Sequence, residues 1–81
     1  MTSEHTWNHR VTLIDGMFGI SEVYYNENGD IELWTALQKP MGETPEELKE
    51  EIEMFLRATE HPILKQVGED EMARLISWEG K

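Results

Sequence analysis

The fold of this 81-residue chain is decided by residues 7–37, WNHRVTLIDGMFGISEVYYNENGDIELWTAL. Two tight-turn dipeptides, Asp15-Gly16 and Asn28-Gly29, divide this stretch, and both consist of residue types that tolerate the positive φ of hairpin turns. Apolar and polar residues alternate between the turns, as expected for strands that bury one face. The stretch therefore predicts a three-stranded antiparallel β-meander. Its strands are expected at 7–14, 17–25 and 31–37.

The two turns also determine which residues share a face of the sheet. If both loops have two residues, Ile14 pairs with Met17 in the first hairpin. In the second hairpin, Glu27 pairs with Asp30. One face is then mostly apolar, and we expect a helix to cover it; its members are Trp7, His9, Val11, Leu13, Phe18, Ile20, Glu22, Tyr24, Ile31, Leu33, Thr35 and Leu37. The opposite face carries Asn8, Arg10, Thr12, Ser21, Val23, Tyr25, Glu32, Trp34 and Ala36.

A helix is predicted over residues 44–59. Its first residues, Thr44-Pro45-Glu46-Glu47, combine an N-cap, a proline at the first helical position and a capping-box glutamate. Its apolar residues recur at helical spacing and predict that one face docks on the sheet. These residues are Leu48, Ile52, Phe55 and Leu56. Pro62 ends the helical region, and residues 62–78 form either a strand or a short helix.

The chain is thus expected to be one α+β domain over 1–81, with a loose terminus at 1–6. The predicted architecture is a three-stranded antiparallel β-meander packed on one amphipathic helix, with a short C-terminal strand or helix (β-β-β-α-β/α).

The composition excludes several classes of function. Seventeen acidic residues stand against seven basic ones, and the formal net charge of −10 repels phosphate groups. Direct binding of nucleic acid or of an anionic membrane is therefore not expected. The chain has no cysteine, which excludes disulfides and thiolate catalysis. The polar first residues and the absence of a long apolar run favour a cytoplasmic protein.

A contact surface is predicted on the polar face of the meander. Val23 and Trp34 are cross-strand neighbours there, Tyr25 lies close by, and Arg10 shares the face. Trp and Tyr are enriched at the centres of protein interfaces, so this patch is the expected site for a partner or a second copy of the chain. Alternatively, the C-terminal segment covers the patch, and Trp34 belongs to the core. That segment supplies Met72, Leu75, Ile76 and Trp78.

The predicted helix adds an acidic face. Its glutamates can attract a basic protein and speed its association. These residues are Glu46, Glu50 and Glu53, with Glu47 and Glu51. The alternative interpretation is that these glutamates only keep the surface solvated, as most runs of charge do.

His9 and Glu22 are the only candidates for acid–base chemistry that the predicted register brings together. A carboxylate beside a histidine can orient the ring for proton transfer. However, Ser21 lacks the glycine spacing of a nucleophile elbow and points to the other face. His5 and His9 lie about 13 Å apart on an extended strand, too far to share a metal ion. We therefore expect no enzyme activity, no metal and no cofactor.

Two resemblances accompany these patterns. The segment Gly42-Glu43-Thr44-Pro45-Glu46-Glu47-Leu48 after a β-meander resembles the N-terminal domain of HicB-type antitoxins, which implies a small β-β-β-α-β fold related to a degenerate ribonuclease-H fold. Residues 7–65 are also similar to a group of short bacterial and phage proteins of unassigned function. The stretches that carry this similarity are Trp7-Asn8-His9-Arg10-Val11, Glu22-Val23-Tyr24-Tyr25-Asn26-Glu27-Asn28-Gly29, Trp34-Thr35 and His61-Pro62-Ile63-Leu64.

Together these features favour a non-catalytic, acidic protein-binding module that inhibits or regulates a basic partner that handles nucleic acid. A phage-borne inhibitor of a bacterial defence complex and an antitoxin-like protein are its two concrete forms. The alternatives are a homodimeric structural protein, and a small ligand-binding or enzyme domain around His9 and Glu22.

Overall fold

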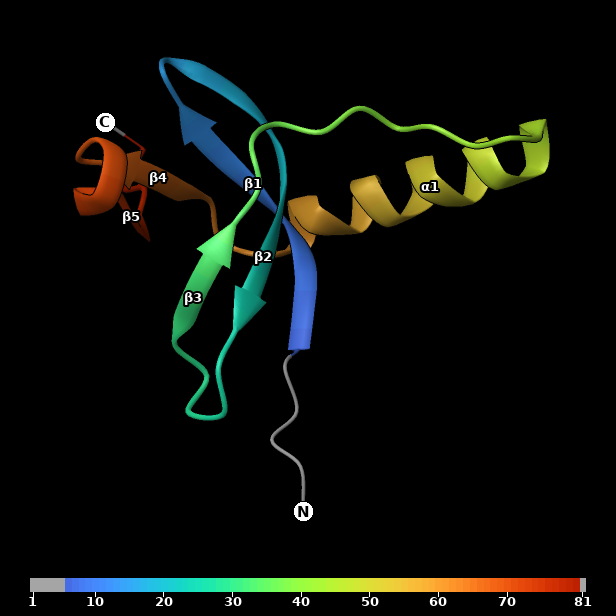
Figure 1. Cartoon of the computed structure of the whole chain (residues 1–81). Coiled ribbons are helices and arrows are strands. Elements are labelled where there is room, and N and C mark those ends of the chain that lie inside the picture. The colour runs from blue at the N-terminus through green and yellow to red at the C-terminus, as the bar shows by residue number, and fades with distance from the viewer. Residues whose placement is uncertain (1–5, 81) are drawn as a thin grey trace.

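A computed structural model describes residues 6–80 and shows an α+β fold with one five-stranded sheet and one α-helix (Figure 1). The elements are β1 (Thr6–Ile14), β2 (Met17–Tyr25), β3 (Ile31–Trp34), α1 (Pro45–Arg57), β4 (Leu64–Val67) and β5 (Arg74–Ser77). The strand order is β3-β2-β1-β4-β5. The pair β1–β4 is parallel and the other pairs are antiparallel. The α+β class is confirmed, but the sheet has five strands, more than the predicted three-stranded meander with a short C-terminal strand or helix.

The first hairpin has the predicted register. Ile14 pairs with Met17, and the turn residues Asp15 and Gly16 have φ values of 52° and 78°. Positive φ at both central positions gives a turn whose twist matches that of the flanking strands. Thr6, expected in a loose terminus, pairs with Tyr25 and begins β1. The rest of that predicted terminus, residues 1–5, lies outside the described residues, as does His5 of the histidine pair.

The second hairpin is longer than the two-residue loop that was predicted. Tyr25 pairs with Ile31, and the register shifts between Tyr24 and Tyr25. The Asn26 side chain explains the longer loop, because its Oδ1 accepts hydrogen bonds from the backbone amides of Asn28 and Asp30. The predicted pair of Glu27 with Asp30 is therefore wrong. Val23 still pairs with Trp34, as predicted.

A second irregularity after β3 moves Leu37 to the other face of the sheet. The Thr35 amide bonds to the Glu22 carbonyl, whereas the Gln38 amide bonds to the Ile20 carbonyl, so the pairing slips by one residue. At this irregularity the Thr35 hydroxyl accepts a hydrogen bond from the Glu22 backbone amide at 2.9 Å. A slip of one residue reverses the side-chain directions. Leu37 consequently lies against Gly19 rather than on the face predicted for it.

Residues 62–78 add two strands to the sheet. β4 pairs in parallel with β1 through Thr12 and Leu64, and β5 returns antiparallel to β4. Gly68 and Asp70, with φ values of 81° and 55°, make the reversal between them. Of the two predicted alternatives for this segment, the strand is therefore the one observed.

The sheet curls, and its core lies on the inner side of the curl. Trp34 on β3 donates from Nε1 to Gln66 Oε1 on β4 at 2.8 Å, although β2 and β1 separate these two strands in the sheet. We call this side the concave face; its residues are Asn8, Arg10, Thr12, Ser21, Val23, Tyr25, Trp34, Leu64 and Gln66. Thr12, Ser21 and Val23 are fully buried there. The core therefore forms on the face that the sequence pattern assigned to contact rather than on the more apolar face.

Helix α1 begins as predicted but does not cover the sheet. The N-cap Thr44 hydroxyl accepts a hydrogen bond from the Glu47 backbone amide, and Pro45 occupies the first turn. The helix starts at a distance from the sheet, runs back toward it and meets β1 only near its C-terminal end (Figure 1). The ring of Phe55 lies 4.9 Å from that of His9, and Ala58, in the 3₁₀ turn that follows α1, is buried. The prediction that the helix packs along the apolar face of the meander is therefore wrong.

Candidate functional site

The predicted contact patch of Val23, Tyr25 and Trp34 lies on the concave face. Val23 has no exposed surface, and Trp34 and Tyr25 are half-buried. β4 covers one side of the patch through Leu64 and Gln66. The covering segment thus lies earlier in the chain than the one that was predicted. Trp78, one of the residues predicted to cover the patch, packs against Phe18 with the ring centres 5.0 Å apart.

Arg10, also predicted to bind a partner, is tied into the fold by hydrogen bonds. Its Nη1 donates to the Tyr25 hydroxyl at 2.9 Å, and its Nη2 donates to the Pro62 carbonyl at 2.8 Å. The Tyr25 hydroxyl in turn donates to Asn8 Oδ1 at 2.9 Å. This network joins β1, β2 and the segment before β4. Arg10 therefore connects strands, and much of its donor capacity is already used.

The predicted pair of His9 and Glu22 does not form a hydrogen bond within residues 6–80. Their backbones are paired across β1 and β2, but Glu22 Oε1 accepts from the Tyr24 hydroxyl at 2.7 Å. That hydrogen bond raises the pKa of Tyr24, because the proton it uses is lost on ionisation. The His9 ring packs between Trp7, 5.2 Å away, and Phe55. The geometry gives the imidazole aromatic neighbours instead of an orienting carboxylate.

An exposed apolar stripe runs along one side of α1, and we call it the α1 stripe. It consists of Leu48, Ile52 and Leu56, whose i, i+4, i+8 spacing places them on one side of the helix. Their exposed fractions are 36%, 47% and 67%. No residue of α1 is buried. The stripe is therefore available for contact, and the sequence had assigned these residues to the interior.

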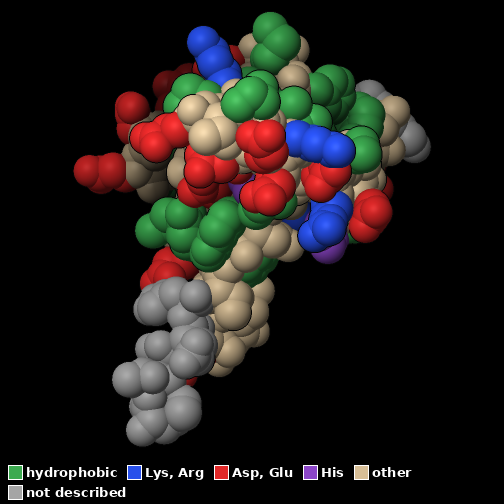
Figure 2. Space-filling model, turned by 90° about the vertical axis from the view of Figure 1, so that its right-hand side faces the viewer, with side chains coloured by type: hydrophobic (Ala, Val, Ile, Leu, Met, Phe, Trp, Pro, Cys, Tyr) green, Lys and Arg blue, Asp and Glu red, His purple; other side chains and the backbone are tan. Residues whose placement is uncertain are grey.

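The glutamates predicted to attract a partner lie on the same helix. Glu46, Glu50 and Glu53 are all exposed. Viewed from the side on which α1 protrudes, acidic and hydrophobic side chains lie next to one another on the surface (Figure 2). At 100° per residue, Glu53, Glu46 and Glu50 lie about 100°, 120° and 160° around α1 from Ile52, so most of the acidic side chains are on the other side of the helix from the α1 stripe.

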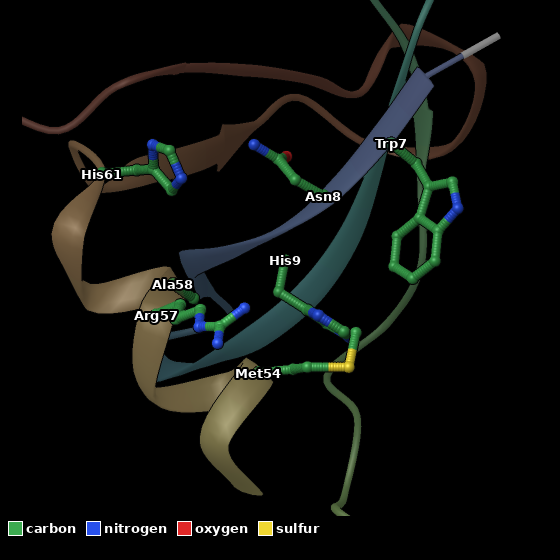
Figure 3. Close-up of a pocket in the computed structure, with 7 residues that line it drawn as sticks. All are labelled: Trp7, Asn8, His9, Met54, Arg57, Ala58 and His61. Atoms are coloured by element: carbon green, nitrogen blue, oxygen red, sulfur yellow. The ribbon is translucent and has the colours of Figure 1, made fainter. Parts of the chain in front are cut away.

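A pocket of about 420 Å³ lies between the start of β1 and the end of α1 (Figure 3). β1 contributes Trp7, Asn8 and His9 to its wall. The helix and the turn after it contribute Met54, Arg57, Ala58 and His61. This pocket could not be predicted from the sequence, because no spacing rule connects residues 7–9 with residues 54–61. The only available sign was an arginine in the last turn of the helix.

No group of three or more His, Asp or Glu side chains within residues 6–80 is arranged to hold a metal ion. No helix among these residues is long and apolar enough to cross a membrane.

No protein-family model, no curated protein and no solved structure matches this chain.

Proposed function

We propose that this protein is a non-catalytic, acidic binding module that docks on a basic protein through the α1 stripe. The observation that carries this proposal is the exposure of Leu48, Ile52 and Leu56 on a helix that leaves the body of the fold. An amphipathic helix that lays its apolar side into a groove is a common mode of protein recognition.

The apolar area on α1 provides the binding energy in this proposal. Burying a Leu or Ile side chain completely is worth about 1.5–3 kcal/mol relative to leaving it in water. The α1 stripe has three such side chains that the fold leaves partly or mostly in solvent. Part of this gain offsets the loss of freedom on association, and the remainder gives the affinity.

The charge of the chain indicates the chemistry of the partner. The net charge is −10, and α1, which carries the stripe, also presents exposed glutamates on its other side. A second copy of the chain would bring another −10 to the same contact, whereas a surface rich in Lys and Arg would be attracted. Proteins that handle nucleic acids present such surfaces, so docking there would block or regulate them. A phage-borne inhibitor of a defence complex and an antitoxin-like protein are the forms of this function that we consider.

The test is affinity capture from a lysate of the source cells at about 0.1 M and about 1 M salt, where the screening lengths are about 10 and 3 Å. Wild type is compared with Ile52→Asp, which interrupts the stripe, and with Glu46→Lys/Glu50→Lys, which reverses two charges. Met72→Asp is the matched control, because Met72 is 77% exposed and lies in the turn between β4 and β5.

We expect wild type and Met72→Asp to retain the same basic protein, and both α1 variants to lose it. The charge dependence also predicts weaker retention by wild type at high salt. Equal retention by Ile52→Asp would contradict docking through α1. A wild-type protein that forms dimers and retains no other protein would contradict a basic partner and favour the homodimer.

A further inference from the structure

The geometry points to a second binding site, independent of the α1 stripe: the pocket between β1 and α1 binds a small aromatic carboxylate. About 420 Å³ of space lies within the range of pockets that hold small organic molecules, about 300–1,000 Å³. Such sites combine apolar walls with a few polar groups that orient the ligand. This pocket has both.

Trp7 and Met54 supply the apolar walls. Trp7 is 45% exposed, and its ring stands at one side of the pocket (Figure 3). Its neighbours fix its position, since the His9 ring meets it edge-on at 5.2 Å and the Tyr24 ring lies 5.9 Å away. Met54 is 39% exposed and adapts to ligand shape through its flexible thioether chain. A flat aromatic ring is the ligand body that fits between an indole and a methionine.

Arg57 supplies the charge that selects a carboxylate. Its guanidinium makes no hydrogen bond or salt bridge with any residue in 6–80, and Figure 3 shows it directed toward the space between α1 and β1. A guanidinium presents paired N–H donors that match the two oxygens of a carboxylate. Arg57 therefore has the free donors that an entering anion needs.

The rest of the wall is compatible with an anion. Asn8 uses its Oδ1 to accept from Tyr25, which leaves its amide nitrogen as a donor. His61 completes the rim, and no Asp or Glu lines the pocket, although the chain has seventeen of them. The absence of carboxylates from the wall removes the main source of repulsion at short range.

The surroundings limit the ligand to a small anion. Glu53 precedes Arg57 by four residues and therefore lies on the same side of α1. This carboxylate and the net charge of −10 disfavour polyanions such as nucleic acids, whereas a single carboxylate can be held by Arg57 alone. Arg57 also lies about 140° around the helix from Ile52, so the pocket and the α1 stripe are separate surfaces.

The probe for this site is 2-naphthoate, titrated into the full chain by calorimetry and by NMR. The uncharged 2-naphthalenemethanol and inorganic phosphate are the reference ligands. Arg57→Gln removes the proposed carboxylate partner. Lys49→Gln is the matched control, because it removes an exposed cation elsewhere on α1.

We expect saturable binding of 2-naphthoate, with shifts of the Trp7 indole signal and weaker binding of both reference ligands. Arg57→Gln should lower the affinity at least about tenfold, because a hydrogen bond to a charged group is worth about 1.5–3 kcal/mol. Lys49→Gln should leave it unchanged. Failure of 2-naphthoate to saturate, equal binding by Arg57→Gln, or equal binding of the uncharged alcohol would overturn the proposal. None of these outcomes depends on the α1 stripe, since Ile52→Asp should bind 2-naphthoate normally.

Discussion

The concave face of the sheet and helix α1 differ in how the chain uses their side chains. The concave face has a mixed sequence with Thr12, Ser21 and Val23 at its centre, yet these three residues are the most deeply buried side chains among those described. Helix α1 has the clearest apolar periodicity in the chain, yet none of its residues is buried. Periodicity therefore shows which side chains can be covered together, but not whether the chain itself covers them.

The curl of the sheet accounts for this difference. β4 joins β1 and brings Gln66 to Trp34, which closes the concave face with elements of the same chain. The Thr12 and Ser21 hydroxyls are 2.7 Å apart, so burial leaves each with a partner. Within residues 6–80 no side chain of α1 is buried, and its stripe stays open for another molecule.

The largest difference between the two regions should appear when a charge is introduced into each. Val23→Asp places a carboxylate where no surface is exposed, and the cost of an unpaired buried charge approaches the whole stability of a small domain, about 5 kcal/mol or more. We expect this variant to lack the folded circular dichroism spectrum. Leu33→Asp, on the neighbouring strand at 51% exposure, is the matched control and should fold. A cooperatively folded Val23→Asp would show that the concave face is open to solvent.

A smaller loss of stability is expected when the hydrogen bond between the two buried hydroxyls of the concave face, those of Thr12 and Ser21, is removed. Thr12→Val leaves the buried Ser21 hydroxyl without its partner and should lower the free energy of unfolding by about 1–3 kcal/mol. The double variant Thr12→Val/Ser21→Ala removes both polar groups and should recover most of that loss. Urea denaturation of the three proteins measures the difference. A double variant that is less stable than Thr12→Val would contradict the role of this hydrogen bond.

A still smaller effect concerns Tyr24 on the outer side of the sheet. Its hydrogen bond to Glu22 raises the pKa of the phenol above the ordinary value of 10.0. Because the folded state favours the protonated phenol, this contribution to stability is present below pH 10 and is lost as the pH rises through the higher folded pKa. Glu22→Ala, which removes both the acceptor and its charge, should bring the Tyr24 pKa down toward 10, as followed by NMR of the ring carbon. An unchanged pKa would mean that the hydrogen bond does not form in solution.

Much of the meander and the start of the helix could be predicted from the sequence, because local signals determine them. Asp15-Gly16 sets the register of β1 and β2, and Thr44-Pro45 starts α1. The shift at Leu37 could not be predicted, since it involves an unusual bond from the Glu22 amide to the Thr35 hydroxyl rather than a turn dipeptide. Side chains that replace backbone acceptors leave no periodic trace in a sequence.

The candidate sites were less predictable, because they depend on contacts between distant segments. The pairing of β4 with β1 joins Thr12 with Leu64, and it decides that Trp34 lies on a covered face. The pocket likewise depends on where the end of α1 meets β1. The sequence identified residues of suitable chemistry, including Trp34 and the α1 glutamates, but the topology determines which of them remain accessible.

The most direct test of the difference between the two regions is urea denaturation of Ile52→Asp. The α1 stripe is a free surface in this account, so the substitution should change the free energy of unfolding of the isolated protein by no more than about 0.5 kcal/mol, as is usual for an exposed site. A loss of several kcal/mol would contradict the account, because it would show that the stripe is already buried in the isolated protein.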